Sequence, residues 1–142
     1  MRSRRIRIVL LPFAVAPLLL AGCSPSSAAD AEAEIKDTFC TEVPALLTDI
    51  TTDLQGFAAA PEQAPQLLTE AVDRISAVEP PADVTPQWQR LVTAWTSLRD
   101  LLAQADLTNP AANADLAPQM SSLQTELIDS GTAVDDYGKA NC

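Results

Sequence analysis

Few side chains in this sequence could carry out catalysis. Histidine is absent, which excludes Ser-His-Asp and Cys-His nucleophile arrangements and haem ligation through an imidazole. Paired carboxylates remain, at Asp49 and Asp53 and at Asp135 and Asp136. Hard cations bind several carboxylate oxygens, but the loop of a calcium motif is missing, so we interpret these pairs as a solvated acidic surface. We therefore expect no enzyme, no metal site and no cofactor.

Two tryptophans, Trp88 and Trp95, are the most informative residues for binding. They are seven positions apart and would share one face of a helix with Leu91 and Leu98. One interpretation is core packing, because large aromatics contribute heavily to cores and the chain has only three Phe and one Tyr besides. The other interpretation is an aromatic wall for a ligand or partner.

The first 22 residues have the pattern of a secretory signal. Residues 1–7 hold four arginines, residues 8–20 form an apolar run interrupted by two prolines, and small residues follow. The apolar run is short, since a membrane-spanning helix needs about 20 apolar residues. The pattern therefore predicts export rather than a transmembrane helix.

The apolar run ends in Leu20-Ala21-Gly22-Cys23. This tetrapeptide resembles the lipobox of bacterial lipoproteins, in which the cysteine receives a thioether-linked diacylglycerol before cleavage in front of it. The resemblance implies a signal peptide at 1–22, a lipidated Cys23 and a tether at 23–29. It places the protein on the extracytoplasmic face of a cell membrane, which would be the outer membrane in a bacterium with two, because Ser24 follows the cysteine. An ordinary signal peptide with a chance cysteine is the alternative.

With Cys23 assigned to lipidation, Cys40 and Cys142 remain as an even pair in an oxidising compartment. We predict a disulfide between them, which would tie down a C-terminus that has few apolar residues to hold it. Two free thiols or a redox-active pair is the alternative, which the absence of a Cys-x-x-Cys spacing disfavours.

The charge of the exported part limits its partners. From Cys23 onward, 19 acidic residues stand against five basic ones, a net charge of −14. Nucleic-acid binding needs a basic surface, so we expect no nucleic-acid partner. Anionic lipid headgroups also repel such a domain, so the folded part should remain at a distance from the membrane surface to which its anchor attaches it.

Residues 30–142 contain four segments in which apolar residues recur at helical spacing, separated by proline-rich stretches. The first begins near Ser27, whose spacing to Asp30 is typical of a capping box. Pro44 lies inside this segment, and the stripe keeps its phase across the proline, which favours a kink over a break. The second segment runs from about residue 62 to residue 78.

The third segment opens at Thr85-Pro86, interpreted as an N-cap followed by a first-turn proline. The fourth follows Asn109-Pro110, a similar start signal. Gly131 lies near its apolar stripe and marks either a close helix approach or a local kink.

These observations predict an all-α fold: an antiparallel up-down-up-down four-helix bundle whose first helix is kinked near Pro44. In such a bundle the start of the first helix lies beside the end of the fourth, where Cys40 and Cys142 fall. The turns from Asp30 to Phe39 would then project past the bridge or fold over that end.

The stripes, the lipobox and Glu79-Pro80-Pro81 followed by Trp88 resemble small helical lipoproteins of bacterial cell envelopes, which implies no particular activity. We expect a non-enzymatic lipoprotein that binds the membrane through its anchor and another envelope protein through its surface. The alternative is a small-molecule binding protein with an interhelical pocket near Trp88 and Trp95.

Overall fold

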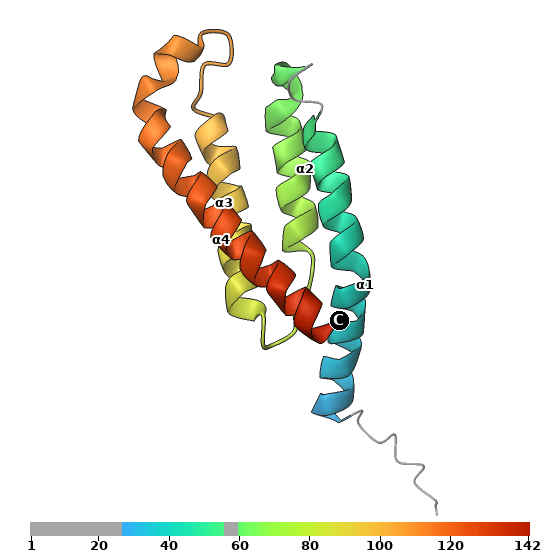
Figure 1. Cartoon of the computed structure of the whole chain (residues 1–142). Coiled ribbons are helices and arrows are strands. Elements are labelled where there is room, and N and C mark those ends of the chain that lie inside the picture. The colour runs from blue at the N-terminus through green and yellow to red at the C-terminus, as the bar shows by residue number, and fades with distance from the viewer. Residues whose placement is uncertain (1–26, 56–59) are drawn as a thin grey trace, which may run out of the picture.

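A computed structural model describes residues 27–55 and 60–142 of the chain, and these ranges contain helices and no strand (Figure 1). The elements are four α-helices, α1 (Ala28–Gln55), α2 (Ala64–Ser76), α3 (Thr85–Leu102) and α4 (Ala117–Asn141), with short 3₁₀ segments η2 (Pro61–Gln63) and η3 (Pro110–Leu116). The prediction of an all-α fold with four helices is confirmed. The signal peptide and Cys23 lie outside the described residues.

The first helix begins with the capping box that its sequence predicts. The Ser27 amide donates to the Asp30 carboxylate at 3.1 Å, and the Asp30 amide donates back to the Ser27 hydroxyl at 3.3 Å. The helix then runs unbroken through Pro44, although this proline cannot donate to the carbonyl of Cys40. A break at Pro44 is therefore excluded, while the kink stays a prediction.

The start of α3 differs from the prediction by one residue. Val84 is the N-cap, because its carbonyl already accepts the first helical bond, from the Trp88 amide at 2.9 Å. The Thr85 hydroxyl donates back to the Pro81 carbonyl at 2.9 Å instead of capping the helix. The proline in the first turn, Pro86, is as predicted.

The fourth helix begins later than its start signal suggested. Pro110 opens the 3₁₀ segment η3, and α-helical geometry begins only at Ala117. Pro118 explains the delay, because it has no amide to donate to the carbonyl of Ala114, which accepts a tighter bond from Ala117. Asn109 makes no side-chain capping bond.

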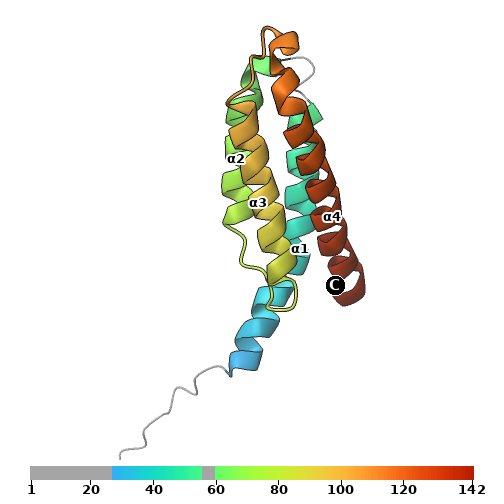
Figure 2. The ribbon, with the colours of Figure 1, turned by 90° about the vertical axis from the view of Figure 1, so that its left-hand side faces the viewer.

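Each helix packs against the next one along the chain, and the contact between α3 and α4 is the most extensive (Figures 1 and 2). Direct contact between α1 and α4 is sparse by comparison. The first turns of α1 extend past the other helices at the end where the C-terminus lies (Figures 1 and 2). Glu32 ties these turns to the α2–α3 connection by accepting the Ala82 amide at 2.7 Å.

The core lies between the apolar faces of all four helices. Most of the buried positions belong to the predicted stripes, and the central cluster consists of Phe39, Val43, Ile50, Ala71, Ile75, Val84, Trp88, Leu91 and Val134. Burial of these side chains is the main favourable term in folding, at about 25 cal/mol per Å² of apolar surface.

One small residue on α4 is fully buried, and it is Ser130 rather than its neighbour Gly131. The Ser130 hydroxyl is satisfied by the Glu126 carbonyl of the preceding turn. A Cβ atom placed on Gly131 would meet no atom within 4 Å, so the expectation of a close helix approach at this glycine is wrong. The helix packing therefore buries Ser130, whose hydroxyl donates a hydrogen bond within its own helix.

Within residues 27–55 and 60–142, no helix is both long enough and apolar enough to span a bilayer.

Candidate functional site

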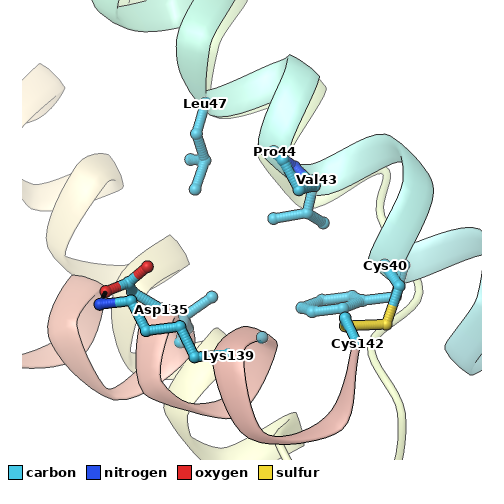
Figure 3. Close-up of a pocket in the computed structure, with 10 residues that line it drawn as sticks. Cys40, Val43, Pro44, Leu47, Asp135, Lys139 and Cys142 are labelled. Atoms are coloured by element: carbon cyan, nitrogen blue, oxygen red, sulfur yellow. Dashed lines mark hydrogen bonds and ion pairs between the residues drawn. A yellow bond between two sulfur atoms is a disulfide. The ribbon is translucent and has the colours of Figure 1, made fainter.

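The candidate site is a groove of about 320 Å³ that opens between α1 and α4 (Figure 3). Helix α1 contributes Phe39, Val43, Pro44 and Leu47, while α4 contributes Val134 and Gly138. The volume falls at the lower end of the range of small-molecule sites, about 300–1,000 Å³. The lining is mainly apolar, as is typical of such sites.

The α1 wall of the groove follows from helical spacing. Phe39, Val43 and Leu47 are four positions apart, so they lie on successive turns of one face. Phe39 and Val43 are buried and form the floor, whereas Leu47 is only partly buried and Pro44 is exposed at the rim. On the α4 side, Val134 is buried against the same floor.

The α4 wall also carries the polar groups of the groove. The Lys139 ammonium donates to the Asp135 carboxylate one turn earlier, and both side chains are exposed. This hydrogen bond, together with the negative charge of Asp135, raises the pKa of Lys139. The groove therefore presents one positive and one negative charge side by side above an apolar floor.

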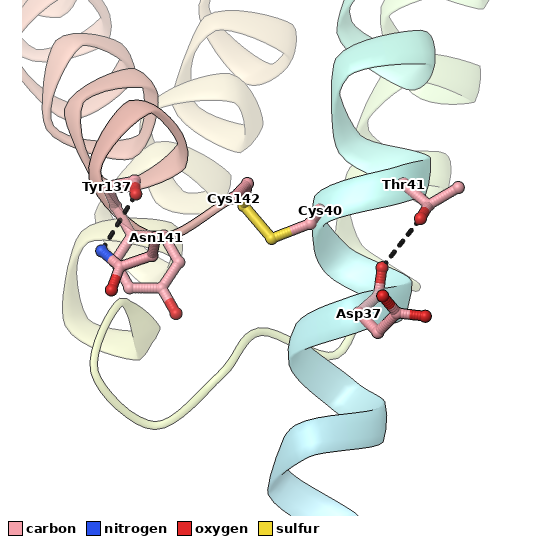
Figure 4. The surroundings of a disulfide bond; sticks show 6 residues. All are labelled: Asp37, Cys40, Thr41, Tyr137, Asn141 and Cys142. Atoms are coloured by element: carbon pink, nitrogen blue, oxygen red, sulfur yellow. Dashed lines mark hydrogen bonds between the residues drawn. A yellow bond between two sulfur atoms is a disulfide. The ribbon is translucent and has the colours of Figure 1, made fainter.

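Cys40 and Cys142 form the predicted disulfide (Figure 4), and both residues line the groove. The two Cα atoms are 5.5 Å apart although the residues are 102 positions apart in the chain. The last turn of α4 is complete up to this bond, because the Cys142 amide donates to the Gly138 carbonyl at 2.9 Å and the Asn141 side chain donates to the Tyr137 carbonyl at 3.0 Å. The bond therefore fastens an ordered helix end to α1.

An aromatic cluster underlies the same end of the molecule. The ring of Phe39 packs edge-to-face against Trp88 at a centroid distance of 5.3 Å and against Tyr137 at 6.0 Å. Phe39 thus connects α1 with both α3 and α4. Burial raises the pKa of Tyr137, with smaller contributions from the negative charges of Asp83 and Glu32.

The two tryptophans occupy different environments and do not line the groove. Trp88 is 2% exposed and belongs to the central cluster, and its indole N–H has no hydrogen-bond partner among the described residues. Trp95 is partly buried at the edge of this cluster. Trp88 is therefore a core residue, whereas the groove is lined by side chains of α1 and α4 and by Cys142.

The sequence contains only a weak signal for this groove. The predicted apolar stripe of α1 runs through Phe39, Val43, Leu46 and Ile50. Leu47 and Pro44 flank this stripe, so apolar residues beside it were the available signal. The open space itself depends on how far α1 and α4 diverge, which residue spacing cannot specify.

Three of the four paired carboxylates form ion pairs with basic side chains. Asp49 and Asp53 on α1 each lie 3.3 Å from the guanidinium of Arg74 on α2, and Asp135 pairs with Lys139. No group of three or more metal-ligating side chains comes together in the part of the chain that the structure describes. Asp49 and Asp53 thus help to join α1 and α2.

A second interhelical ion pair joins α3 to α4. The Arg90 guanidinium makes two parallel bonds to the Glu126 carboxylate, at 2.9 and 3.1 Å. This hydrogen-bonded pair lowers the pKa of Glu126 and raises that of Arg90.

The groove as a whole offers an apolar floor and one ion pair whose two charges are bonded to each other. No protein-family model, curated protein or solved structure matches this chain.

Proposed function

We propose that this protein is exported, anchored by lipid at Cys23 to the extracytoplasmic face of a bacterial membrane, and acts there by binding rather than by catalysis. The observation that carries the proposal is the position of Leu20-Ala21-Gly22-Cys23 directly after a short apolar run with a basic start. The disulfide between Cys40 and Cys142 supports it, because structural disulfides persist mainly in oxidising compartments.

The exported domain belongs, in this proposal, to the antiparallel up-down-up-down bundles, with its first helix kinked at Pro44. Packing of each helix against the next supports this arrangement. So does the disulfide, which joins the early part of α1 to the residue after α4. The bundle remains open along the α1–α4 seam, where the groove lies.

The anchor would hold the start of α1 close to the bilayer. The tether from Cys23 to Ser27 can extend about 3.4 Å per residue, or roughly 17 Å in total. The first turns of α1 carry Asp30, Glu32 and Glu34, which anionic headgroups repel. This repulsion would keep the body of the domain away from the surface and accessible to another envelope protein.

A second candidate function is the binding of a small molecule, and the groove between α1 and α4 is the observation that favours it. The location differs from the one expected from the sequence, because Trp88 is buried in the core and Trp95 lies at its edge.

Substitution of Cys23 tests the anchor. In cells given a palmitate label, Cys23→Ala should abolish labelling and detergent-phase partitioning and leave the uncleaved precursor. Cys40→Ser is the matched control, because it also removes one thiol but should keep the label. Mass spectrometry of the mature wild-type protein should find a diacylated cysteine as its first residue. A label that persists in Cys23→Ala, or a different first residue, would overturn the proposal.

A further inference from the structure

We propose that the disulfide between Cys40 and Cys142 is a reversible latch between α1 and α4, opened in the folded protein by a dithiol that attacks the sulfur of Cys142. The natural reductant belongs to the class of exported dithiol proteins, an assignment that rests on the proposed export. The exchange itself does not depend on the anchor. Three features of the bond lead to this inference: its exposure, its place between two helices that touch little, and the contacts that remain without it.

The two cysteines differ in access. Cys142 is an exposed residue, whereas Cys40 is half-buried on α1. Both residues also line the groove, so the bond borders open space (Figure 3). Access helps to decide which sulfur of a disulfide a thiolate attacks. Cys142 therefore offers the point of attack, and the domain need not unfold for a thiol to reach it.

Few other backbone contacts join α1 to α4. Helix α4 makes its most extensive contact with α3, and α1 packs against α2. Beside the bond, α1 and α4 share the edge-to-face contact of Phe39 with Tyr137, at a centroid distance of 6.0 Å. When the bond is reduced, each helix therefore keeps its neighbour along the chain, and only the seam between α1 and α4 loses its covalent link.

The end of α4 is the part that the bond holds in place. Beyond Val134, this helix has no fully buried side chain. Its last turn is closed by hydrogen bonds within the helix, from the Cys142 amide to the Gly138 carbonyl and from the Asn141 side chain to the Tyr137 carbonyl. A helix end with few buried contacts frays readily. Reduction should therefore release the last turn of α4 and leave the rest of the fold in place.

The exchange balances with one dithiol and needs no other reactant. A thiolate of the dithiol attacks the Cys142 sulfur, and the electron pair of the broken bond leaves on the Cys40 sulfur, which takes up a proton. The second thiolate of the dithiol then attacks its own sulfur in this mixed disulfide and releases Cys142 as a thiol. The dithiol loses two electrons and two protons, and the domain gains them. The pair is thus a substrate of exchange rather than its catalyst, in agreement with the absence of a Cys-x-x-Cys spacing.

Reduction kinetics distinguish attack on the folded protein from attack after unfolding. The test uses the full chain with Cys23→Ala in mild detergent, so that Cys40 and Cys142 are its only cysteines and lipid at position 23 plays no part. Dithiothreitol is the probe. The rate at which thiols appear should rise in proportion to its concentration, and destabilising the core far from the bond should leave this rate unchanged.

Leu68→Ala supplies this destabilisation. Leu68 is fully buried in the first half of α2, which starts at the end of the molecule away from the C-terminus (Figure 1). The variant should raise the unfolded population at least about thirtyfold, so reduction through the unfolded state would accelerate by a similar factor. Where Leu68→Ala does not fold, Ile50→Val in the buried face of α1 replaces it, with a rise of at least about twofold. A rate that increases in these variants, or that stops rising with the dithiothreitol concentration, would overturn the latch.

Glutathione locates the attacked sulfur. It is a monothiol, so acid can stop the exchange at the mixed disulfide, and mass spectrometry then identifies the modified cysteine. Early samples should carry glutathione on Cys142 and a free thiol on Cys40. Glutathione mainly on Cys40, or equally on both residues, would overturn the assigned point of attack.

Hydrogen exchange shows what the bond holds. The double variant Cys40→Ser/Cys142→Ser represents the open latch, and its helix content by circular dichroism should equal that of the oxidised protein. Exchange of the amides in the last turn of α4 should rise more than exchange of those in α3. Equal rises in both helices, or a loss of helix content, would show that the bond holds the whole fold and would overturn the latch. Palmitate labelling of Cys23 tests the anchor separately, because none of these results depends on it.

Discussion

Cys40 and Cys142 are bonded across 102 positions of sequence, with their Cα atoms 5.5 Å apart. The loop that this bond closes contains the second half of α1 and all of α2, α3 and α4. Because the backbones of α1 and α4 approach each other at few positions, the bond adds a covalent link to the side-chain contacts along this seam, such as that between Phe39 and Tyr137. Both cysteines also line the groove.

Loss of this disulfide should destabilise the domain strongly. Cys142→Ser should lower the free energy of unfolding by about 2–5 kcal/mol, since the unfolded chain gains the entropy of an open loop. Thermal unfolding followed by circular dichroism measures the effect. The double variant Cys40→Ser/Cys142→Ser should match the single one, and so should the wild type after reduction. An unfolding midpoint that does not move on reduction would contradict a stabilising role.

Truncation of Phe39 should be as costly, for a different reason. Phe39 is 2% exposed and packs against both Trp88 and Tyr137, so Phe39→Ala should lower the free energy of unfolding by about 3–5 kcal/mol through lost burial and a cavity. Ile128→Ala, on the exposed side of α4, should change it by less than about 0.5 kcal/mol.

Fluorescence quenching tests whether the Phe39 ring shields Trp88 from solvent. In a Trp95→Phe background, Trp88 is the only tryptophan. Iodide should quench its fluorescence poorly in the otherwise wild-type protein and better after Phe39→Ala. Strong iodide quenching of Trp88 without the Phe39 substitution would contradict its burial.

The ion pair between Arg90 and Glu126 predicts a pH-dependent difference in stability. The pKa of Glu126 is lowered in the folded protein from its ordinary value of 4.5, mainly by the hydrogen bond from Arg90. The ionised carboxylate therefore stabilises the fold above this ordinary value, and the contribution is lost as the pH falls through the lowered pKa. Glu126→Gln should melt slightly below the wild type at pH 7, and this difference should shrink as the pH is lowered below the ordinary pKa of the carboxyl group.

The control for this pair is Asp115→Asn, which removes an exposed carboxylate from η3. It should not reproduce the pH-dependent difference in melting. High salt should reduce the effect of Glu126→Gln at pH 7, because the pair is exposed to solvent. A difference between wild type and Glu126→Gln that grows on acidification would contradict the assigned sign.

Local rules of sequence predicted the elements and much of the core. The capping box at Ser27 and Asp30 and the first-turn proline at Pro86 follow from hydrogen bonds made within a few residues, so they can be recognised without a fold. Where the prediction failed, two local signals competed. Thr85 had an N-cap's side chain, but its hydroxyl bonds to Pro81, and Pro118 moved the start of α4 past Asn109.

By itself the sequence determined that the chain from residue 30 onward has helical segments with apolar stripes and that no histidine chemistry is available, and it predicted that Cys40 and Cys142 pair. These properties depend on residue type and spacing along one chain. The tertiary structure decided that Trp88 is enclosed, that Ser130 rather than Gly131 is the small buried residue, and that α1 and α4 diverge to leave a groove. Each of those depends on the distance between helices, which is set by the packing of side chains far apart in the sequence.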